Sequence, residues 1–242
     1  MTFTFITVCY NAATTLEATI RSVVEQTYGQ VEYIIVDGAS TDGTREVIER
    51  YAMHIDTLIC EPDKGIYDAM NKGLVRATGD YVCFLNAGDA LHTPNTLQAM
   101  VESIPEGTMP DVLYGETALV DEQRRFLRMR RLQTPEHLTW RSFQKGMTVC
   151  HQSFYVRRKL APCYNLRYRY SADVDWCIRV MQQATVLHNT HLVLTDYLAE
   201  GTTTRHRLAS LIERLRIMVH YYGLLPTLWR HIGFVFRLVS KP

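Results

Sequence analysis

Short apolar runs alternate with helical stretches through the first ninety residues of the chain. The apolar runs have the length of buried strands and are rich in β-branched side chains; they are Phe3–Cys9, Val31–Val36, Ile55–Cys60 and Asp80–Leu85. The stretches between them have helical spacing: they are Thr14–Gln26, Arg45–Tyr51 and a helix that begins near Ile66. Alternation of this kind predicts βαβ units with right-handed connections, so residues 1–90 are interpreted as a nucleotide-binding α/β domain with a parallel sheet.

Polar residues follow these predicted strands, at the edge where open α/β sheets bind ligands. Tyr10 follows the first strand and offers a ring suited to cover a flat base, or else packs at the strand end. Asp37 ends the second strand and either accepts the imide N–H of a uracil or thymine or closes a turn before Gly38. Asp89 follows the fourth strand, where a carboxylate can hold a divalent cation against a diphosphate.

The helix near Ile66 offers a second group of polar side chains. Lys64 lies directly before it, and a lysine beside a helix N-terminus attracts anions, although a solvated loop lysine has the same sequence. Asp68, Asn71 and Lys72 are spaced to share one helix face. This face either lines a donor pocket or is simply exposed.

Six segments in order resemble family 2 glycosyltransferases of the GT-A fold. They are Val8–Asn11, Val36–Thr44, the segment from Asp63 to Gly73, Phe84–Asp89, His151–Phe154 and Ser171–Arg179. The likeness covers about residues 3 to 205 and is greatest to the branch that builds bacterial exopolysaccharide, including colanic-acid-type transferases. It implies a mostly parallel, Rossmann-like sheet flanked by helices, with a nucleotide-sugar half (1–90), an acceptor half (91–205) and a C-terminal helical tail (206–242).

The resemblance also implies a role for individual residues. The residues that match the family's donor-binding positions are Tyr10, Asp37, Lys64, Asn71, Asn86, Gly88 and Asp89. Where the family commonly has two or three acids, only Asp89 keeps a charge, so it is the expected ligand of Mg²⁺ or Mn²⁺. On the acceptor side, Asp173 matches the base that takes the proton of the incoming hydroxyl, Asp175 is the alternative, and His151 and Gln152 match a segment beside the active site.

The implied reaction is direct, inverting transfer of a sugar from a nucleotide-sugar donor, expected to be UDP-linked, to a hydroxyl of a growing, lipid-linked glycan. The segment 201–207 is expected to close over the donor, with Arg205 or His206 beside the diphosphate. A dinucleotide-dependent oxidoreductase is disfavoured because no G-x-G-x-x-G follows the first strand. A nucleotidyltransferase would need a glycine-rich basic loop there. The remaining alternative is a non-catalytic nucleotide-sugar-binding subunit, against which the retained Asp89 and Asp173 argue.

Composition fits one compact enzyme and adds an expectation about location. The net charge of +1 over 242 residues predicts no nucleic-acid partner, and the six cysteines, without a C-x-x-C pair, favour reduced thiols. No signal segment or apolar run of roughly 18 residues is present, which favours the cytoplasm. After Glu213 the tail has no acid. A predicted helix there carries an apolar stripe from Leu228 to Val239 on one side and basic residues on the other. This pattern predicts peripheral attachment to the cytoplasmic face of the inner membrane; packing on its own domain or in a homodimer is the alternative.

A second basic region lies within two predicted strands, residues 112–120 and 126–132. Its arginines are at positions 124, 125, 128, 130 and 131. They are interpreted either as a contact for a phosphate-bearing acceptor or an anionic membrane, or as the charged edge of a solvated hairpin.

Overall fold

One mixed sheet runs through both halves of the chain in this computed structural model, which describes residues 1–199 and 207–229. The strand order is β3-β2-β1-β4-β8-β6-β9-β5, with β7 paired to β6. The strands are β1 (Phe3–Cys9), β2 (Val31–Asp37), β3 (Thr57–Cys60), β4 (Tyr81–Phe84), β5 (Ala90–Leu91), β6 (Val112–Val120), β7 (Phe126–Met129), β8 (Phe154–Arg157) and β9 (Leu187–Leu198). The α/β architecture predicted from the sequence is therefore confirmed.

The first half of the sheet is parallel. Strand β1 pairs with β2 on one side and with β4 on the other, and β3 continues the parallel order beyond β2. All seven residues of β1 are buried, because helices cover both faces of the strand. Cys9 and Asp37 are register partners, so the carboxyl ends of β1 and β2 lie level at one edge. The predicted third strand begins later than expected, because Ile55 is bonded back to Ala52 in a 3₁₀ turn.

The second half of the sheet is mixed. Strand β8 runs antiparallel to both β4 and β6, whereas β6 and β9 are parallel over most of their length. The short strand β5 pairs with the end of β9, which brings the segment after β4 next to residues 195–198. This pairing joins the two predicted halves directly behind Asp89.

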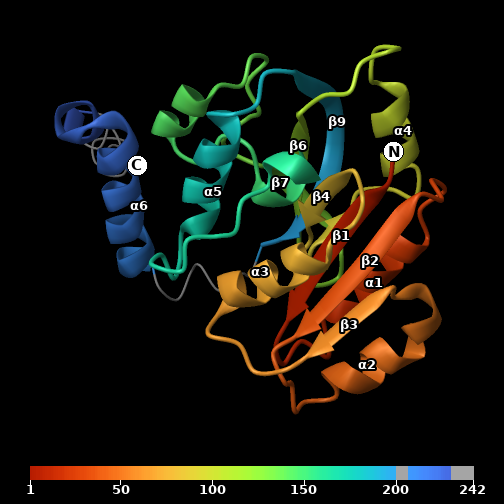
Figure 1. Ribbon diagram of the computed structural model, residues 1–242. Coiled ribbons are helices and arrows are strands. Elements are labelled where there is room, and N and C mark those ends of the chain that lie inside the picture. The colour runs from red at the N-terminus through yellow and green to blue at the C-terminus, as the bar shows by residue number, and fades with distance from the viewer. Residues whose placement is uncertain (200–206, 230–242) are drawn as a thin grey trace.

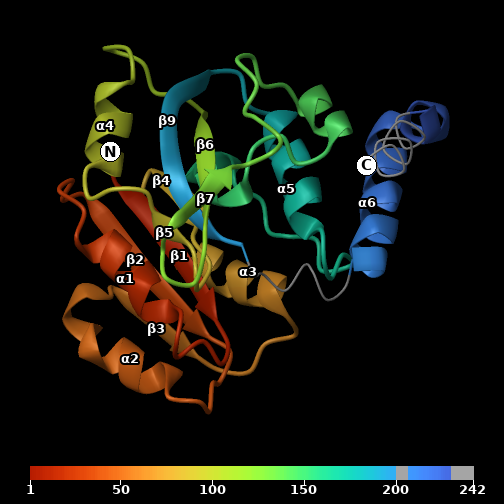
Figure 2. The ribbon, with the colours of Figure 1, turned by 180° about the vertical axis from the view of Figure 1, so that it is seen from behind.

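Helices form a layer on each face of the sheet (Figures 1 and 2). They are α1 (Leu16–Val24), α2 (Thr44–Arg50), α3 (Ile66–Arg76), α4 (Thr96–Glu102), α5 (Ala172–Met181) and α6 (Arg207–Tyr222). Buried residues of α1, α2 and α4 form one apolar core with β1 and β2, and those of α3 and α5 form a second core on the opposite face. In α3, a Cβ at Gly73 would lie 2.5 Å from Ile6, so glycine lets this helix approach the sheet closely.

The C-terminal helix α6 packs on the outside of α5 (Figure 1). The Glu213 carboxylate accepts hydrogen bonds from the backbone N–H groups of Arg169, Tyr170 and Ser171, at 2.8, 2.7 and 3.0 Å. The Tyr221 hydroxyl donates to Asp175 at 2.8 Å. The described part of the predicted tail thus packs on its own domain. Residues 230–242, which contain the rest of the predicted apolar stripe, lie outside the described residues, as do residues 201–206 of the predicted loop 201–207.

Candidate active site

A tight turn follows β4 and presents Asp89. The Asp89 N–H donates to the Asn86 carbonyl at 2.9 Å, and Gly88 has a φ of 103°. A turn with this φ at its third position requires a residue that tolerates the left-handed region, which glycine does without steric cost. A Cβ at Gly88 would also lie 3.1 Å from Leu198. Gly88 is therefore fixed by backbone geometry, and an acid at this position would be strained.

The Asp89 carboxylate is only 5% exposed and is held on both sides. Gln152 donates its amide N–H to one oxygen at 2.8 Å, and the Leu198 backbone N–H donates to the other at 3.1 Å. Burial raises the pKa of Asp89 to about 7. The structure thus brings Gln152, predicted on the acceptor side, against the acid predicted to bind the cation.

The oxygens at this turn can serve a divalent cation. The Asn86 side-chain oxygen is buried and has no hydrogen-bond partner within residues 1–199 and 207–229. Each Asp89 oxygen keeps a lone pair beyond its one hydrogen bond. Within the same residues, no group of three or more acids, histidines or cysteines can enclose a metal. The donor set therefore suits a cation that takes most of its oxygen ligands from a diphosphate and water.

An aromatic and a carboxylate side chain meet over Gly38, beyond the ends of β1 and β2. Tyr10 is 65% exposed, and a Cβ at Gly38 would lie 3.3 Å from its ring and 2.5 Å from the Asp63 carboxylate. One oxygen of Asp63 accepts the Gly65 N–H at 2.8 Å. Asp63 was not among the predicted site residues. Two features of the sequence mark it: Asp63 begins one of the six family-like segments, and it lies two residues before Gly65, the residue ahead of α3.

Asp37 is engaged in the turn that follows β2. Its side chain is fully buried, and its carboxylate accepts hydrogen bonds from the Ser40 backbone N–H and hydroxyl. The Arg45 guanidinium approaches it at 3.5 Å. The carboxylate closes the turn after β2, as the alternative interpretation has it, and its contact with a uracil or thymine stays a prediction. The partly exposed carboxylate near Tyr10 is that of Asp63.

Asn71 is hydrogen-bonded to a segment far along the chain, and its contact with the donor stays a prediction. Its amide N–H donates to the Tyr164 carbonyl at 3.1 Å, and its oxygen accepts the Tyr164 N–H at 2.6 Å. These bonds fasten α3 to the segment before α5. Lys72, on the same helix face, is engaged with Glu61 at 2.8 Å. Lys64 is exposed at the N-terminal end of α3, as the sequence predicted.

The two acids of α5 point to different surroundings. Asp173, in the first turn, is half-buried and accepts a hydrogen bond from the Tyr67 hydroxyl at 3.1 Å. Asp175 is buried and is held by Arg179 at 2.9 Å and by Tyr221. Ser171 precedes α5 but does not cap it with its side chain, because the Ser171 hydroxyl is bonded to Ser210. Asp173 thus remains as the more accessible carboxylate, whereas Asp175 joins α5 to α6.

His151 lies in an aromatic cluster beneath Asp173. It stacks on Phe84 with ring centroids 5.2 Å apart and meets Trp176 edge-on. Its Nε2 shares a hydrogen bond with the Tyr164 hydroxyl. Burial lowers the pKa of His151 to about 4, so the ring is neutral at physiological pH. In this structure His151 is a buried packing residue, and the position of its segment beside the active site stays a prediction.

Tyr197 of β9 lies within electrostatic range of both Asp89 and Asp173. Burial raises its pKa, and the charges of Asp89 and Asp173 raise it further. Tyr197 was not among the predicted site residues, because β9 itself was not predicted.

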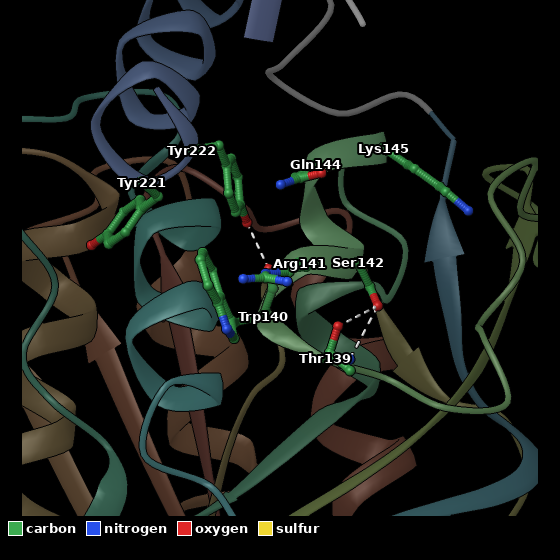
Figure 3. Close-up of a pocket in the computed structure, with 8 residues that line it drawn as sticks. All are labelled: Thr139, Trp140, Arg141, Ser142, Gln144, Lys145, Tyr221 and Tyr222. Atoms are coloured by element: carbon green, nitrogen blue, oxygen red, sulfur yellow. Dashed lines mark hydrogen bonds between the residues drawn. The ribbon is translucent and has the colours of Figure 1, made fainter. Parts of the chain in front are cut away.

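A separate pocket of about 570 Å³ lies between α6 and the 3₁₀ helix Trp140–Lys145 (Figure 3). Its lining contains two cations and no acid: Thr139, Trp140, Arg141, Ser142, Gln144, Lys145, Tyr221 and Tyr222. Trp140 stacks on Tyr222 at 5.3 Å, and Arg141 lies 5.3 Å from the centre of the Trp140 ring. None of the predicted site residues lines this pocket.

Comparison with known proteins identifies the family. Residues 4–163 match the model of glycosyl transferase family 2. Over 210 residues the chain is 34% identical to a PGL/p-HBAD biosynthesis glycosyltransferase of Mycobacterium bovis. This match covers 81% of this chain and 76% of the relative. The structure resembles S. aureus TarS 1–349 in complex with UDP-GlcNAc, with a TM-score of 0.72 and 17% identity over 100% of this chain and 76% of TarS 1–349.

A further structural neighbour is the mannosyltransferase PcManGT of Pyrobaculum calidifontis in complex with GDP-Man and Mn²⁺. Its TM-score is 0.63 at 17% identity, over 99% of this chain and 76% of the neighbour. At these identities the structural neighbours establish a shared GT-A fold, and the sequence match establishes descent. The chain therefore belongs to glycosyl transferase family 2.

Proposed function

We propose that this glycosyltransferase is an inverting hexosyltransferase that moves a sugar from a UDP-linked donor to a hydroxyl of a growing, lipid-linked bacterial surface glycan. The observation that carries the proposal is the position of Asp173. Its carboxylate is half-buried and is oriented by the Tyr67 hydroxyl, and its charge acts on the Tyr197 hydroxyl together with that of Asp89. A catalytic base and a cation-binding acid at one site suit displacement at a carbon held between them.

The proposed chemistry is a single displacement. Asp173 takes the proton of the acceptor hydroxyl as its oxygen forms a bond to the anomeric carbon. The bond from that carbon to the diphosphate breaks, and its electron pair leaves with the nucleotide. Because attack and departure occur on opposite faces of the sugar, the configuration at the anomeric carbon inverts. The hydrogen bond from Tyr67 keeps the Asp173 carboxylate oriented toward the incoming hydroxyl.

The donor would lie along the carboxyl ends of β1, β2 and β4. We place the nucleobase of the donor on the exposed face of Tyr10, near Asp63. The diphosphate would then lie at the turn Asn86–Asp89. Asp89 and Asn86 would hold Mg²⁺ or Mn²⁺, which supplies positive charge to the departing diphosphate. Lys64, exposed ahead of α3, is the proposed cationic contact at the near end of this path.

A ligand screen tests the donor assignment. A nucleotide sugar that binds only the folded chain raises the melting temperature in proportion to occupancy. We expect stabilisation by UDP sugars in Mn²⁺, less stabilisation in EDTA, and release of UDP when a glycan acceptor is added. Stabilisation without UDP release under any acceptor condition would favour the non-catalytic nucleotide-sugar-binding subunit. Equal stabilisation in Mn²⁺ and EDTA would contradict the cation site.

We further propose that the C-terminal region attaches the enzyme to the cytoplasmic face of the inner membrane. Several apolar side chains of this region are exposed: Leu208, Leu211, Ile212, Leu225 and Trp229. No helix within the described residues is long and apolar enough to span a bilayer. We expect the full chain to bind anionic liposomes at low salt, and a chain that ends at residue 225 not to bind them. Equal binding of both chains would show that residues 226–242 are not needed for attachment, and would assign them to packing on their own domain or in a homodimer.

A further inference from the structure

The hairpin between β6 and β7 contains an unusual arginine. The Arg124 N–H donates to the Asp121 carbonyl at 3.0 Å, and the Asp121 N–H donates to the Arg125 carbonyl at 3.1 Å. Arg124 follows this turn with a φ of 62°. Three-residue hairpin loops normally place glycine at such a left-handed position, because a side chain is unfavourable there. Strained residues of this kind cluster at functional sites.

The Arg124 side chain is turned inward without a partner. Both terminal guanidinium nitrogens are buried, and neither has a hydrogen bond to any residue that the structure describes. Its neighbours on the same hairpin differ: Arg125 pairs with Asp121 at 2.7 Å, and Arg128 is exposed. A buried, unpaired cation is costly, so its position needs a compensating anion.

The backbone places this guanidinium beside the turn that carries Asp89. Val120, at the end of β6, is the register partner of Leu198, whose N–H is bonded to Asp89. Burial lowers the pKa of Arg124, and the nearby charges that oppose this shift are Asp89 and Asp196. Neither forms an ion pair with Arg124 in the described part of the chain: Asp89 is held by Gln152, and Asp196 by His92 at 2.7 Å.

We propose that Arg124 binds the diphosphate of the nucleotide-sugar donor. This inference rests on the donor site proposed above. The turn Asn86–Asp89 and the hairpin together offer one unpaired buried acceptor, on Asn86, and one set of unpaired buried donors, on Arg124. A cation with its diphosphate satisfies both groups. Arg124 also supplies positive charge to the diphosphate at a turn where this chain has a single carboxylate.

Substitution by glycine separates ligand binding from folding. Arg124→Gly relieves the left-handed strain, so we expect a melting temperature equal to or above that of the wild type. Loss of charge-assisted hydrogen bonds should raise the Kd of UDP and of inorganic pyrophosphate about 10- to 100-fold. The Kd of uridine, which has no diphosphate, should not change. Arg124→Lys, which keeps the charge, should restore part of the affinity.

Arg128→Gly is the matched control, because Arg128 lies exposed on the same hairpin. It should leave all three dissociation constants unchanged. An unchanged Kd for UDP in Arg124→Gly overturns the inference but leaves the donor site intact. Equal loss of UDP and uridine affinity assigns Arg124 a structural role and also overturns it. A wild-type chain that binds neither UDP nor pyrophosphate overturns the donor site together with this inference.

Discussion

The two halves of the molecule hold their functional side chains in different ways. In the first half, Asp37 and Asp63 lie in turns closed by near neighbours, with Ser40 three residues from Asp37 and Gly65 two residues from Asp63, although Asp89 at the end of this half is held from far along the chain. In the second half, the groups are held from far along the chain. Tyr67 is 106 residues from Asp173, and Asn71 is 93 residues from Tyr164. Local turns can be recognised in a sequence, whereas hydrogen bonds between residues far apart in the sequence become visible only in the folded structure.

The comparison has a functional consequence. The turns of the first half lie at the end of a rigid parallel sheet, which suits a site for a nucleotide of fixed shape. The surroundings of Asp173 depend on contacts among α3, α5, α6 and the segment 158–170. Substitutions in the first half should therefore act mainly through ligand contacts, and those in the second half through both chemistry and packing.

The largest expected effect separates the two acids of α5. Asp173→Asn should lower the rate of transfer by about 10²- to 10⁴-fold, the usual consequence of losing an acid–base group, with donor binding retained. Asp175→Asn is the matched control and should chiefly destabilise the fold, because Arg179 and Tyr221 lose a charged partner. Turnover per folded molecule and thermal melting measure the two effects. A fully active Asp173→Asn would remove Asp173 as the base.

The pH dependence of stability tests the aromatic cluster. The folded-state pKa of His151, about 4, lies below its usual value of 6.5. The unfolded chain therefore binds the proton more readily, and this contribution to stability is present above pH 6.5 and lost as the pH falls toward 4. The shift corresponds to about 3 kcal/mol at most. In His151→Phe, the free energy of unfolding should depend less on pH over this range. A pH dependence equal to that of the wild type would mean that His151 is exposed to solvent.

The smallest expected effect compares two asparagines. Asn71→Ala removes two long-range hydrogen bonds to Tyr164 and should lower the free energy of unfolding by about 2 kcal/mol. Asn165→Ala removes one bond to the N–H two residues away and should cost about 0.5 kcal/mol. Urea denaturation measures both, with the donor Kd as a second readout. A donor Kd that rises in Asn71→Ala, without loss of stability, would return Asn71 to the donor site.

Sequence patterns predicted the first half of the fold closely. Strand β1 has the predicted bounds, β2 ends one residue later than predicted, and β4 is one residue shorter at each end. The agreement is close because continuous apolar runs identify strands buried on both faces. Strand β9 was missed. It is half-exposed along most of its length and is interrupted at His191, which has a φ of 55°, so its pattern resembles neither a buried strand nor a clean alternation.

The candidate site was predicted less completely than the fold. The positions of Tyr10, Asp89 and Asp173 follow from strand ends and a helix start, which local patterns reveal. Whether Asp37 faces a ligand or Ser40 depends on a side-chain rotamer, which a sequence does not determine. The inward direction of Arg124 depends in the same way on a left-handed residue within an otherwise exposed hairpin.

The contact of Glu213 with three backbone N–H groups makes α6 thermodynamically linked to the start of α5. Any partner that binds the docked form of α6 more tightly than the undocked form must favour the ordered loop ahead of Asp173 by the same free energy. The coupling is reciprocal, so an acceptor that orders this loop tightens the hold of that partner on α6. In a surface-bound enzyme, such a linkage would confine high activity to molecules already at the surface.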